Sequence, residues 1–366
     1  MKKKLMLLCV ICLVLALVAP LYVVGCATQA PTPAPAPAEG PILWRLNTWQ
    51  SATRMEIPYM EMAAQEIYER SNGRLTIEIY PAFSLGHDPT TWLRDMKEGA
   101  IDISCVYPAY TGGEEPSFTV DEMPGIWKSK EQALLASDAL FNFKKRIYKD
   151  VWNSEFISSG CILSQYGVLF TTGTQVKTLT DVEGLKIRTP GGRHKELWTL
   201  LGAAPQMMPQ PDIYMALKTG VIDGCYTGSS TCLQTNFYEV TSYAIPWGPT
   251  DEALAQDIVV SNRAWNELTP DLQQILRDVW ERWAATLKGR TIAAIDDPWY
   301  QEQLEAKGVV YSTLSEKDTA QLREYGMQVF TKWISETGGC TEEAWQIIKP
   351  FLIEPATPGE PEEMFK

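Results

Sequence analysis

Apolar and polar positions along this chain follow two periods, one typical of strands and one typical of helices. Short apolar runs bounded by polar or turn residues predict strands at Leu43–Thr48, Leu75–Tyr80, Ile101–Val106, Cys161–Tyr166, Leu169–Thr171, Leu185–Arg188, Val221–Tyr226 and Val309–Tyr311. Apolar residues at helical spacing predict helices between them, at residues 60–68, 88–98, 130–149, 193–201, 212–219, 269–295 and 315–338. Because strands and helices alternate, we expect an α/β protein with mostly parallel sheets.

One short phrase occurs twice, as Gly99-Ala100-Ile101-Asp102 and as Gly220-Val221-Ile222-Asp223. Each copy follows a predicted helix, and each of these helices follows a predicted strand. Two similar strand–helix–strand units predict two similar lobes with a cleft between them. The chain has 366 residues, more than a single core usually supports, which also favours two lobes.

The N-terminal sequence is typical of an export signal, because Met1-Lys2-Lys3-Lys4 precedes an apolar run over residues 5–24. That run is also long enough to span a bilayer, so a permanent anchor helix is the alternative. It ends in Val23-Val24-Gly25-Cys26, which resembles a bacterial lipobox, where cleavage precedes a cysteine that is then acylated. We therefore expect a lipoprotein signal peptide over residues 1–25 and a lipid on Cys26. The protein would then lie in the periplasm or on the outer face of the cytoplasmic membrane.

Both ends of the remaining chain have a biased composition. Residues 26–41 are rich in Pro and Ala, which favours an extended polyproline II linker between the membrane and the folded body. Residues 355–366 are rich in Pro and Glu, and we expect a mobile tail. Loss of residues 1–25 removes three lysines and no acid, so the net charge changes from −13 to −16. Such an acidic body disfavours nucleic acid as a partner.

The residues of catalytic and metal sites are scarce. The chain has two histidines, His87 and His194, and it lacks the GxSxG, HExxH and CxxC motifs. We therefore predict no enzyme, no bound metal and no cofactor. Five cysteines follow Cys26, namely Cys105, Cys161, Cys225, Cys232 and Cys340. Their odd number is not a disulfide framework, and a single bridge between Cys225 and Cys232 is the alternative to buried free thiols.

Arg188 is the best single candidate for contact with a ligand. It ends a predicted strand and precedes Pro190-Gly191-Gly192, which opens a helix. Ligands of α/β proteins gather at the carboxyl ends of strands, where a guanidinium can bind a carboxylate through two parallel hydrogen bonds. The alternative for Arg188 is an ion pair with a nearby acid on the surface.

Aromatic residues follow several of the predicted strands, where they could line a slot for an apolar or ring-bearing solute. The alternative for each of them is packing in the core or between lobes. The candidates are Trp49, Tyr107, Tyr110, Tyr166, Tyr226 and Trp247.

The segment Ser71–Pro81, with Leu85-Gly86 after it, resembles the extracytoplasmic solute receptors of TRAP (tripartite ATP-independent periplasmic) transporters, the DctP-like family. The resemblance covers about residues 43–338, and three further stretches carry it in the same order, namely Gly99–Asp102, Leu179–Pro190 and Ala216–Gly224. It implies two α/β lobes of the periplasmic-binding-protein type, joined by a hinge, with a long helix spanning both and a solute between them. It also implies that Arg188 matches the family's carboxylate-binding arginine. The partner would be a membrane permease driven by an ion gradient.

On this interpretation, lobe I comprises residues 42–165 and 255–295, and lobe II comprises residues 166–254 and 296–354. The chain departs from the family after its second Asp-Gly, where many members have Gln-Glu-Asn-Pro or a Glu-Trp pair and this chain has Cys225-Tyr226-Thr227-Gly228. A phenol and a hydroxyl at Tyr226 and Thr227 disfavour a C4-dicarboxylate, sialic acid or a metal-bridged oxo-acid. They favour a small organic acid with one carboxylate and an apolar or aromatic body.

Two other functions stay open at this point. A ligand-sensing partner of a membrane signalling protein would have the same fold, and neighbouring permease or histidine kinase genes would separate the two. An extracellular hydrolase is disfavoured because no nucleophile–base pair is evident. A monomer is the default for such receptors.

Overall fold

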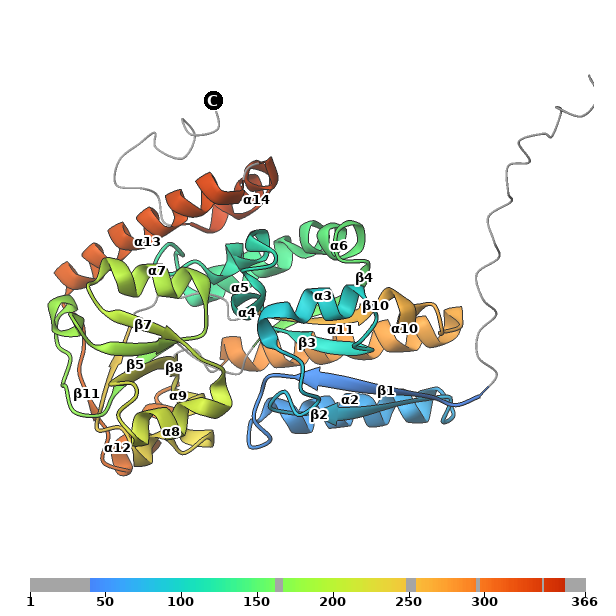
Figure 1. Ribbon diagram of the computed structural model, residues 1–366, viewed down its shortest axis with the longest axis horizontal. Helices are drawn as coiled ribbons and strands as arrows, with labels where there is room; N and C mark the ends of the chain where they lie inside the picture. Colours follow the sequence, from blue (N-terminus) through green and yellow to red (C-terminus); the bar gives the residue numbers. More distant parts are fainter. Residues whose placement is uncertain (1–39, 162–166, 248–254, 294–296, 338, 353–366) are drawn as a thin grey trace, which may run out of the picture. The chain divides into compact units, whose positions relative to one another are not determined.

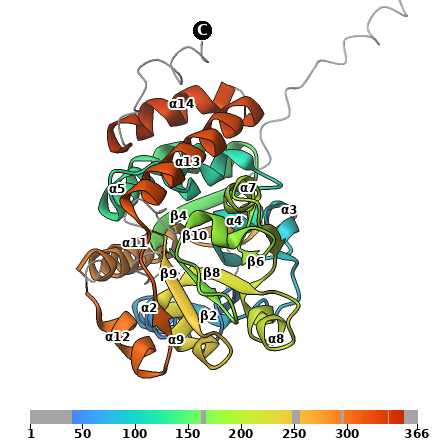
Figure 2. The ribbon, with the colours of Figure 1, turned by 90° about the vertical axis from the view of Figure 1, so that its left-hand side faces the viewer.

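The computed structural model describes residues 40–161, 167–247, 255–293, 297–337 and 339–352. All of them belong to one compact unit, Pro37–Lys366. They form two sheets with interleaved helices, which confirms the predicted two-lobed α/β fold (Figures 1 and 2). The predicted signal peptide and Cys26 lie outside the described residues. None of the helices in the described ranges is long and apolar enough to cross a membrane.

The first sheet has five strands in the order β2-β1-β3-β10-β4. These strands are β1 (Ile42–Thr48), β2 (Leu75–Tyr80), β3 (Ile103–Val106), β4 (Ser154–Cys161) and β10 (Ala255–Ser261). The helices of this part of the chain include α2 (Glu56–Arg70), α3 (Trp92–Lys97), α4 (Pro108–Thr111), η3 (Pro116–Glu122), α5 (Lys130–Ala139), α6 (Phe141–Asp150), α10 (Asn262–Trp265) and α11 (Pro270–Ala293). The single helix predicted at residues 130–149 is therefore two helices, which meet at Leu140.

The second sheet has six strands in the order β11-β9-β5-β8-β6-β7. These strands are β5 (Gly167–Thr171), β6 (Lys186–Thr189), β7 (Ala204–Met207), β8 (Gly224–Gly228), β9 (Tyr243–Pro246) and β11 (Val310–Tyr311). Its helices include α7 (Gly192–Leu200), α8 (Ile213–Lys218), α9 (Ser229–Gln234) and α12 (Trp299–Ala306).

Both sheets are mostly parallel, as predicted, but each contains one strand that runs in the opposite direction. β10 runs antiparallel to β3 and β4, and β5 runs antiparallel to β8 and β9. Each of these two strands follows a strand of the other sheet, with only residues 162–166 or 247–254 between them. Each therefore enters its sheet without the crossover helix that keeps successive strands parallel.

The repeated phrase has the same structural role in both lobes. The glycine that opens each copy has a positive φ, 76° at Gly99 and 73° at Gly220, and ends the preceding helix. The aspartate that closes each copy accepts a hydrogen bond from the backbone N–H of the neighbouring strand, from Arg45 at 3.0 Å or from Lys186 at 2.8 Å. The phrase thus joins a helix end to a strand and recurs because the two lobes are built alike.

The long helices late in the chain hold several elements together. α11 packs along β4 and α2, next to the first sheet. α13 (Glu316–Thr337) contacts η3, which belongs to the first half of the chain, and α7, which follows β6 of the second sheet (Figure 2). α14 (Gly339–Ile348) packs against α5 and η3. The lobe boundaries given above stay a prediction.

Candidate functional site

Arg188 lies near the carboxyl end of β6, between β7 and β8, and only 4% of its surface is exposed. Its Nε donates to the backbone carbonyl of Met208 at 2.9 Å, and its Nη1 donates to that of Tyr226 at 3.3 Å. Its Nη2 donates to the phenol oxygen of Tyr110 at 3.2 Å. These three bonds hold the guanidinium in one orientation at the edge of the sheet.

The Arg188 guanidinium is only partly satisfied by the protein. It has five N–H donors, and three of them find acceptors within the described residues. No carboxylate of the described ranges forms an ion pair with it. A buried charge without a counter-charge is costly, so this arrangement favours an anion that arrives from outside. The alternative of a surface ion pair does not hold for the part of the chain that the structure describes.

Three of the predicted aromatic residues form one cluster beside Arg188. Trp49 stacks on Tyr107 with ring centroids 5.1 Å apart, and Tyr107 meets Tyr110 edge-on at 5.2 Å. Phe83, which the sequence did not single out, packs edge-on against Tyr110 at 5.9 Å. Burial raises the pKa of Tyr110, although Arg188 opposes this shift, and the phenol therefore stays protonated at neutral pH.

Tyr226 and Trp247 form a second cluster with residues of α7. The Tyr226 ring lies 4.7 Å from His194 and 5.7 Å from Trp198, and Trp198 lies 4.6 Å from Trp247. Since side chains alternate along a strand, the Tyr226 ring and Thr227 face opposite sides of β8.

Arg188 and Thr227 share a face of the second sheet. The register partner of Arg188 on β8 is Cys225, two residues before Thr227, so Thr227 points to the same side as the guanidinium. Tyr226 accepts a hydrogen bond from Arg188 through its backbone carbonyl. The remaining candidate, Tyr166, lies outside the described residues.

Several contacts join the two halves of the chain around Arg188. Ser51, which follows β1, donates its backbone N–H to the Gln210 side chain at 3.2 Å. Farther along, Arg54 donates to Thr231 at 2.5 Å. Together with the bond between Arg188 and Tyr110, these contacts show the lobes closed on each other.

Sequence reasoning did not single out two buried polar residues, Gln210 and Asn47. Gln210 accepts from Ser51, and its backbone N–H donates to the Tyr110 phenol. Asn47, near the end of β1, is buried, and neither its amide oxygen nor its amide nitrogen has a partner in the described ranges. A buried amide without partners is unusual in a folded protein and is a further candidate for ligand contact. Asn47 lies near the end of a strand and Gln210 follows one. The rule that ligands gather at the carboxyl ends of strands, which selected Arg188, therefore applies to these two residues as well.

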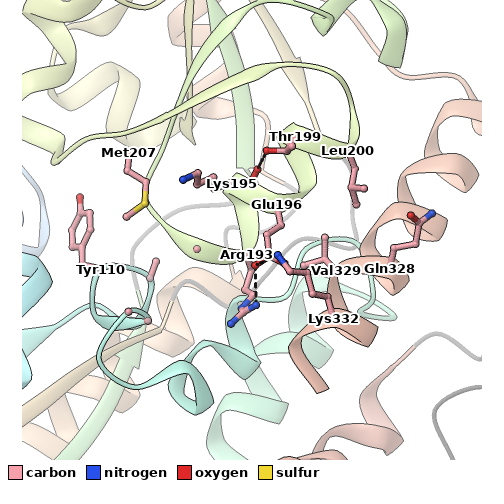
Figure 3. Close-up of a pocket in the computed structure, with 14 residues that line it drawn as sticks. Tyr110, Arg193, Lys195, Glu196, Thr199, Leu200, Met207, Gln328, Val329 and Lys332 are labelled. Carbon is pink, nitrogen blue, oxygen red and sulfur yellow. Dashed lines mark hydrogen bonds and ion pairs between the residues drawn. The ribbon is translucent and has the colours of Figure 1, made fainter. Parts of the chain in front are cut away.

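A groove of about 640 Å³ lies where α4, α7 and α13 meet (Figure 3). Three cations line it, namely Arg193, Lys195 and Lys332. Arg193 pairs with Glu196 at 3.0 Å and with Glu336 at 2.9 Å, and Lys332 pairs with Glu196 at 3.3 Å. Carboxylates of the protein therefore already balance most of the positive charge that lines the groove. Arg188, whose charge has no such partner in the described ranges, does not line this groove.

The two histidines do not form a catalytic pair. The Nδ1 atom of His87 lies 2.8 Å from the carboxylate of Asp95, whereas His194 is buried against Tyr226. No group of three or more potential metal ligands occurs in the described ranges.

Cys225 and Cys232 are buried free thiols, not a bridge. Burial raises the pKa of Cys225 to about 12 and that of Cys232 well above its ordinary value. These thiols therefore stay protonated and pack as small apolar groups.

Residues 47–336 match the family model of the bacterial extracellular solute-binding proteins, family 7 (DctP). The chain belongs to this family. The DctP family comprises the solute-binding receptors of TRAP transporters, which are periplasmic binding proteins and not enzymes.

Similar proteins bind different small acids. A monocarboxylate 2-oxoacid-binding periplasmic protein of Nostoc sp. is 27% identical over 261 residues, which are 68% of each chain. Two further curated solute-binding proteins are matched over only 63% and 65% of their own length.

Solved structures share the fold at low sequence identity. The Bordetella pertussis receptor DctP7, which binds pyroglutamic acid, has a TM-score of 0.77 at 18% identity and covers 84% of this chain and 99% of its own. A TRAP solute-binding protein from Rhodoferax ferrireducens, solved with copurified benzoate, has a TM-score of 0.71 at 21% identity and covers 85% of this chain and 97% of its own.

Proposed function

We propose that this protein is the extracytoplasmic receptor of a TRAP transporter that captures a monocarboxylate with an apolar or aromatic body. It delivers this solute to the membrane permease of that transporter. The observation that carries the proposal is the buried Arg188 guanidinium, which has two N–H donors to spare and no carboxylate partner in the described ranges. Two neighbouring N–H groups are what one carboxylate requires.

A single carboxylate fits this site better than two. One buried cation balances one negative charge, and the two neighbouring cations along the chain are already paired, Lys186 with Asp223 and Arg193 with Glu196 and Glu336. The aromatic cluster of Trp49, Tyr107 and Tyr110 supplies apolar faces next to the guanidinium. The acids bound by the Nostoc, Bordetella and Rhodoferax proteins named above support this class, since each carries one carboxylate.

The ligand class can be tested with a small panel of acids. We expect benzoate, pyroglutamate or pyruvate to raise the melting temperature more than succinate or sn-glycerol-3-phosphate at equal concentration. An acid at 100 times its Kd adds about 2.7 kcal/mol to the free energy of unfolding, which a melting curve resolves. Native mass spectrometry of the purified protein would identify a copurified acid. Tighter binding of succinate than of every monocarboxylate would contradict the proposed class, and no binding of any acid by either method would contradict the receptor function.

We also propose that the receptor is held at the membrane as a monomer by a lipid on Cys26, after removal of residues 1–25. The support is the lipobox-like sequence Val23–Cys26 and the Pro-rich spacer that follows it. In the native host we expect labelled palmitate to enter the wild-type protein, and Cys26→Ser to abolish the labelling. A mature N-terminus at any residue other than Cys26 would show that the signal is cut at a different place.

A further inference from the structure

Two distant segments of the chain approach each other closely near Arg188, where Gly191 meets the backbone of Ala109. A Cβ atom placed on Gly191 would lie 1.9 Å from the carbonyl oxygen of Ala109 and 2.8 Å from its carbonyl carbon. Cβ atoms in folded proteins do not approach other heavy atoms this closely, and the opposing atoms are backbone, which cannot rotate away as a side chain can. The contact therefore excludes every residue except glycine at position 191.

The backbone conformation does not explain this glycine. The φ angle of Gly191 is 176°, an extended value that any residue adopts, so the left-handed region is not the reason. What position 191 requires is the absence of a side chain, because α4 and α7 pack against each other here (Figure 2). The next residue, Gly192, lies in the same turn, and a Cβ atom placed on it would have no heavy atom within 4 Å.

The contact flanks the bond that joins the lobes at Arg188. Gly191 follows Arg188 by three residues, and Ala109 precedes Tyr110, which accepts from Arg188 at 3.2 Å. Relief of the clash to an ordinary contact distance would move the two backbones apart by about 1.5 Å. A shift of that size breaks the bond between Arg188 and Tyr110, because hydrogen bonds weaken steeply beyond about 3.5 Å.

We infer that Gly191 is the positioning residue for lobe closure: its missing side chain allows α7 to reach α4 and thereby completes the Arg188 site. Any side chain at position 191 holds the receptor open. This inference rests on the proposed function only in that closure is taken to enclose the solute.

The test compares Gly191→Ala with Gly192→Ala, two substitutions of the same kind at adjacent positions. Spin labels on cysteines replacing Glu69 of α2 and Lys218 of α8, both exposed, report the distance between the lobes by double electron–electron resonance. The samples are protein as purified and protein with benzoate, pyroglutamate or pyruvate. We expect wild type and Gly192→Ala to show the short distance of the closed structure in at least one sample, and Gly191→Ala to lack it in all of them.

Binding kinetics separate closure from a merely structural effect. We expect Gly191→Ala to raise the Kd of the bound acid roughly 10–100-fold, through faster dissociation with little change in the association rate. The melting temperature of the ligand-free protein should stay near that of wild type, because the added methyl group clashes only in the closed state. The inference would be overturned if Gly191→Ala showed the short distance of the closed structure, or if wild type lacked this distance in every sample. Either result would count whether or not an acid of the panel binds. Failure of all acids to bind, with the closed distance present in wild type and lost in Gly191→Ala, would instead count against the proposed function and leave this inference standing.

Discussion

Replacement of Arg188 by Ala is expected to abolish capture of the solute while the protein stays folded. Each hydrogen bond between a guanidinium and a carboxylate contributes roughly 1.5–3 kcal/mol, so the loss of two should raise the Kd about 10²–10⁴-fold. The ligand-free fold should tolerate the change, because a buried cation without a counter-ion is removed together with its bonds to Met208, Tyr226 and Tyr110. Isothermal titration with the best acid of the panel measures the first effect, and melting of the ligand-free protein measures the second.

A matched control for this experiment is Lys195→Ala. Lys195 is an exposed cation in the α4–α7–α13 groove, and its loss changes the net charge by the same amount. We expect its Kd to stay within about twofold of wild type, since exposed charges are screened by salt. Arg188→Lys should recover only part of the affinity, because an ammonium cannot form the paired bonds of a planar fork. Equal affinities in wild type and Arg188→Ala would remove this residue from the binding site.

The sequence was sufficient to predict the lobes and the position of Arg188, because both depend on local patterns. The strand before Arg188 is a short apolar run, and the residues after it, Pro190 to Gly192, have the composition of a turn into a helix. The rule that ligands gather at strand ends then selected Arg188 and the aromatic residues Trp49, Tyr107 and Tyr110. The structure brings these four residues together, and their contact with a solute stays a prediction.

The parts that escaped prediction depend on contacts between distant segments. β7 has a Pro in a four-residue strand, and β9 is also four residues long, so neither has an alternating pattern long enough to detect. The orientation of β10 is set by the way the chain returns from the other sheet, which no local pattern encodes. The same holds for Gly191, where the need for glycine comes from the carbonyl group of Ala109, 82 positions earlier in the chain.

A buried ionic network in the first lobe offers the largest expected effect on stability. Lys144 of α6 lies 2.7 Å from a carboxylate oxygen of Asp121 and 3.4 Å from one of Asp257, and all three side chains are fully buried. Asp257 also accepts from Tyr148 at 3.0 Å and from Ser159 at 2.8 Å. The network joins η3, α6, β4 and β10, and one lysine serves two carboxylates in it.

The pKa shifts reflect this imbalance. Burial by itself lowers the pKa of Lys144, but the charges of Asp121 and Asp257 outweigh it and raise the pKa above the ordinary value. Burial raises the pKa of Asp257, and the nearby charge of Asp121 adds to this, although Lys144 opposes both. Both pKa shifts fit a network in which two carboxylates share a single ammonium group. The stability of the network therefore depends most on Lys144.

Lys144→Met is therefore expected to lower the free energy of unfolding by about 3–5 kcal/mol, because it leaves two buried carboxylates without a cation. Urea denaturation of the ligand-free protein measures this, with Lys149→Met as the control. Lys149 lies exposed on the same helix, and its replacement should change stability by no more than about 0.5 kcal/mol.

The effect of Lys144→Met should also depend on pH in one direction. A raised pKa in the folded state means that the stability from Lys144 is fully present below the ordinary lysine pKa of about 10.4 and is lost as the pH rises through the folded value. The gap in stability between wild type and Lys144→Met should thus be constant from about pH 7 to pH 10 and shrink above it. A gap that stays constant at higher pH, or a Lys144→Met protein as stable as Lys149→Met, would show that the lysine contributes packing and not charge. In that case Asp121 and Asp257 would have to be neutral in the folded protein, and Asp257→Asn would leave the stability at neutral pH unchanged.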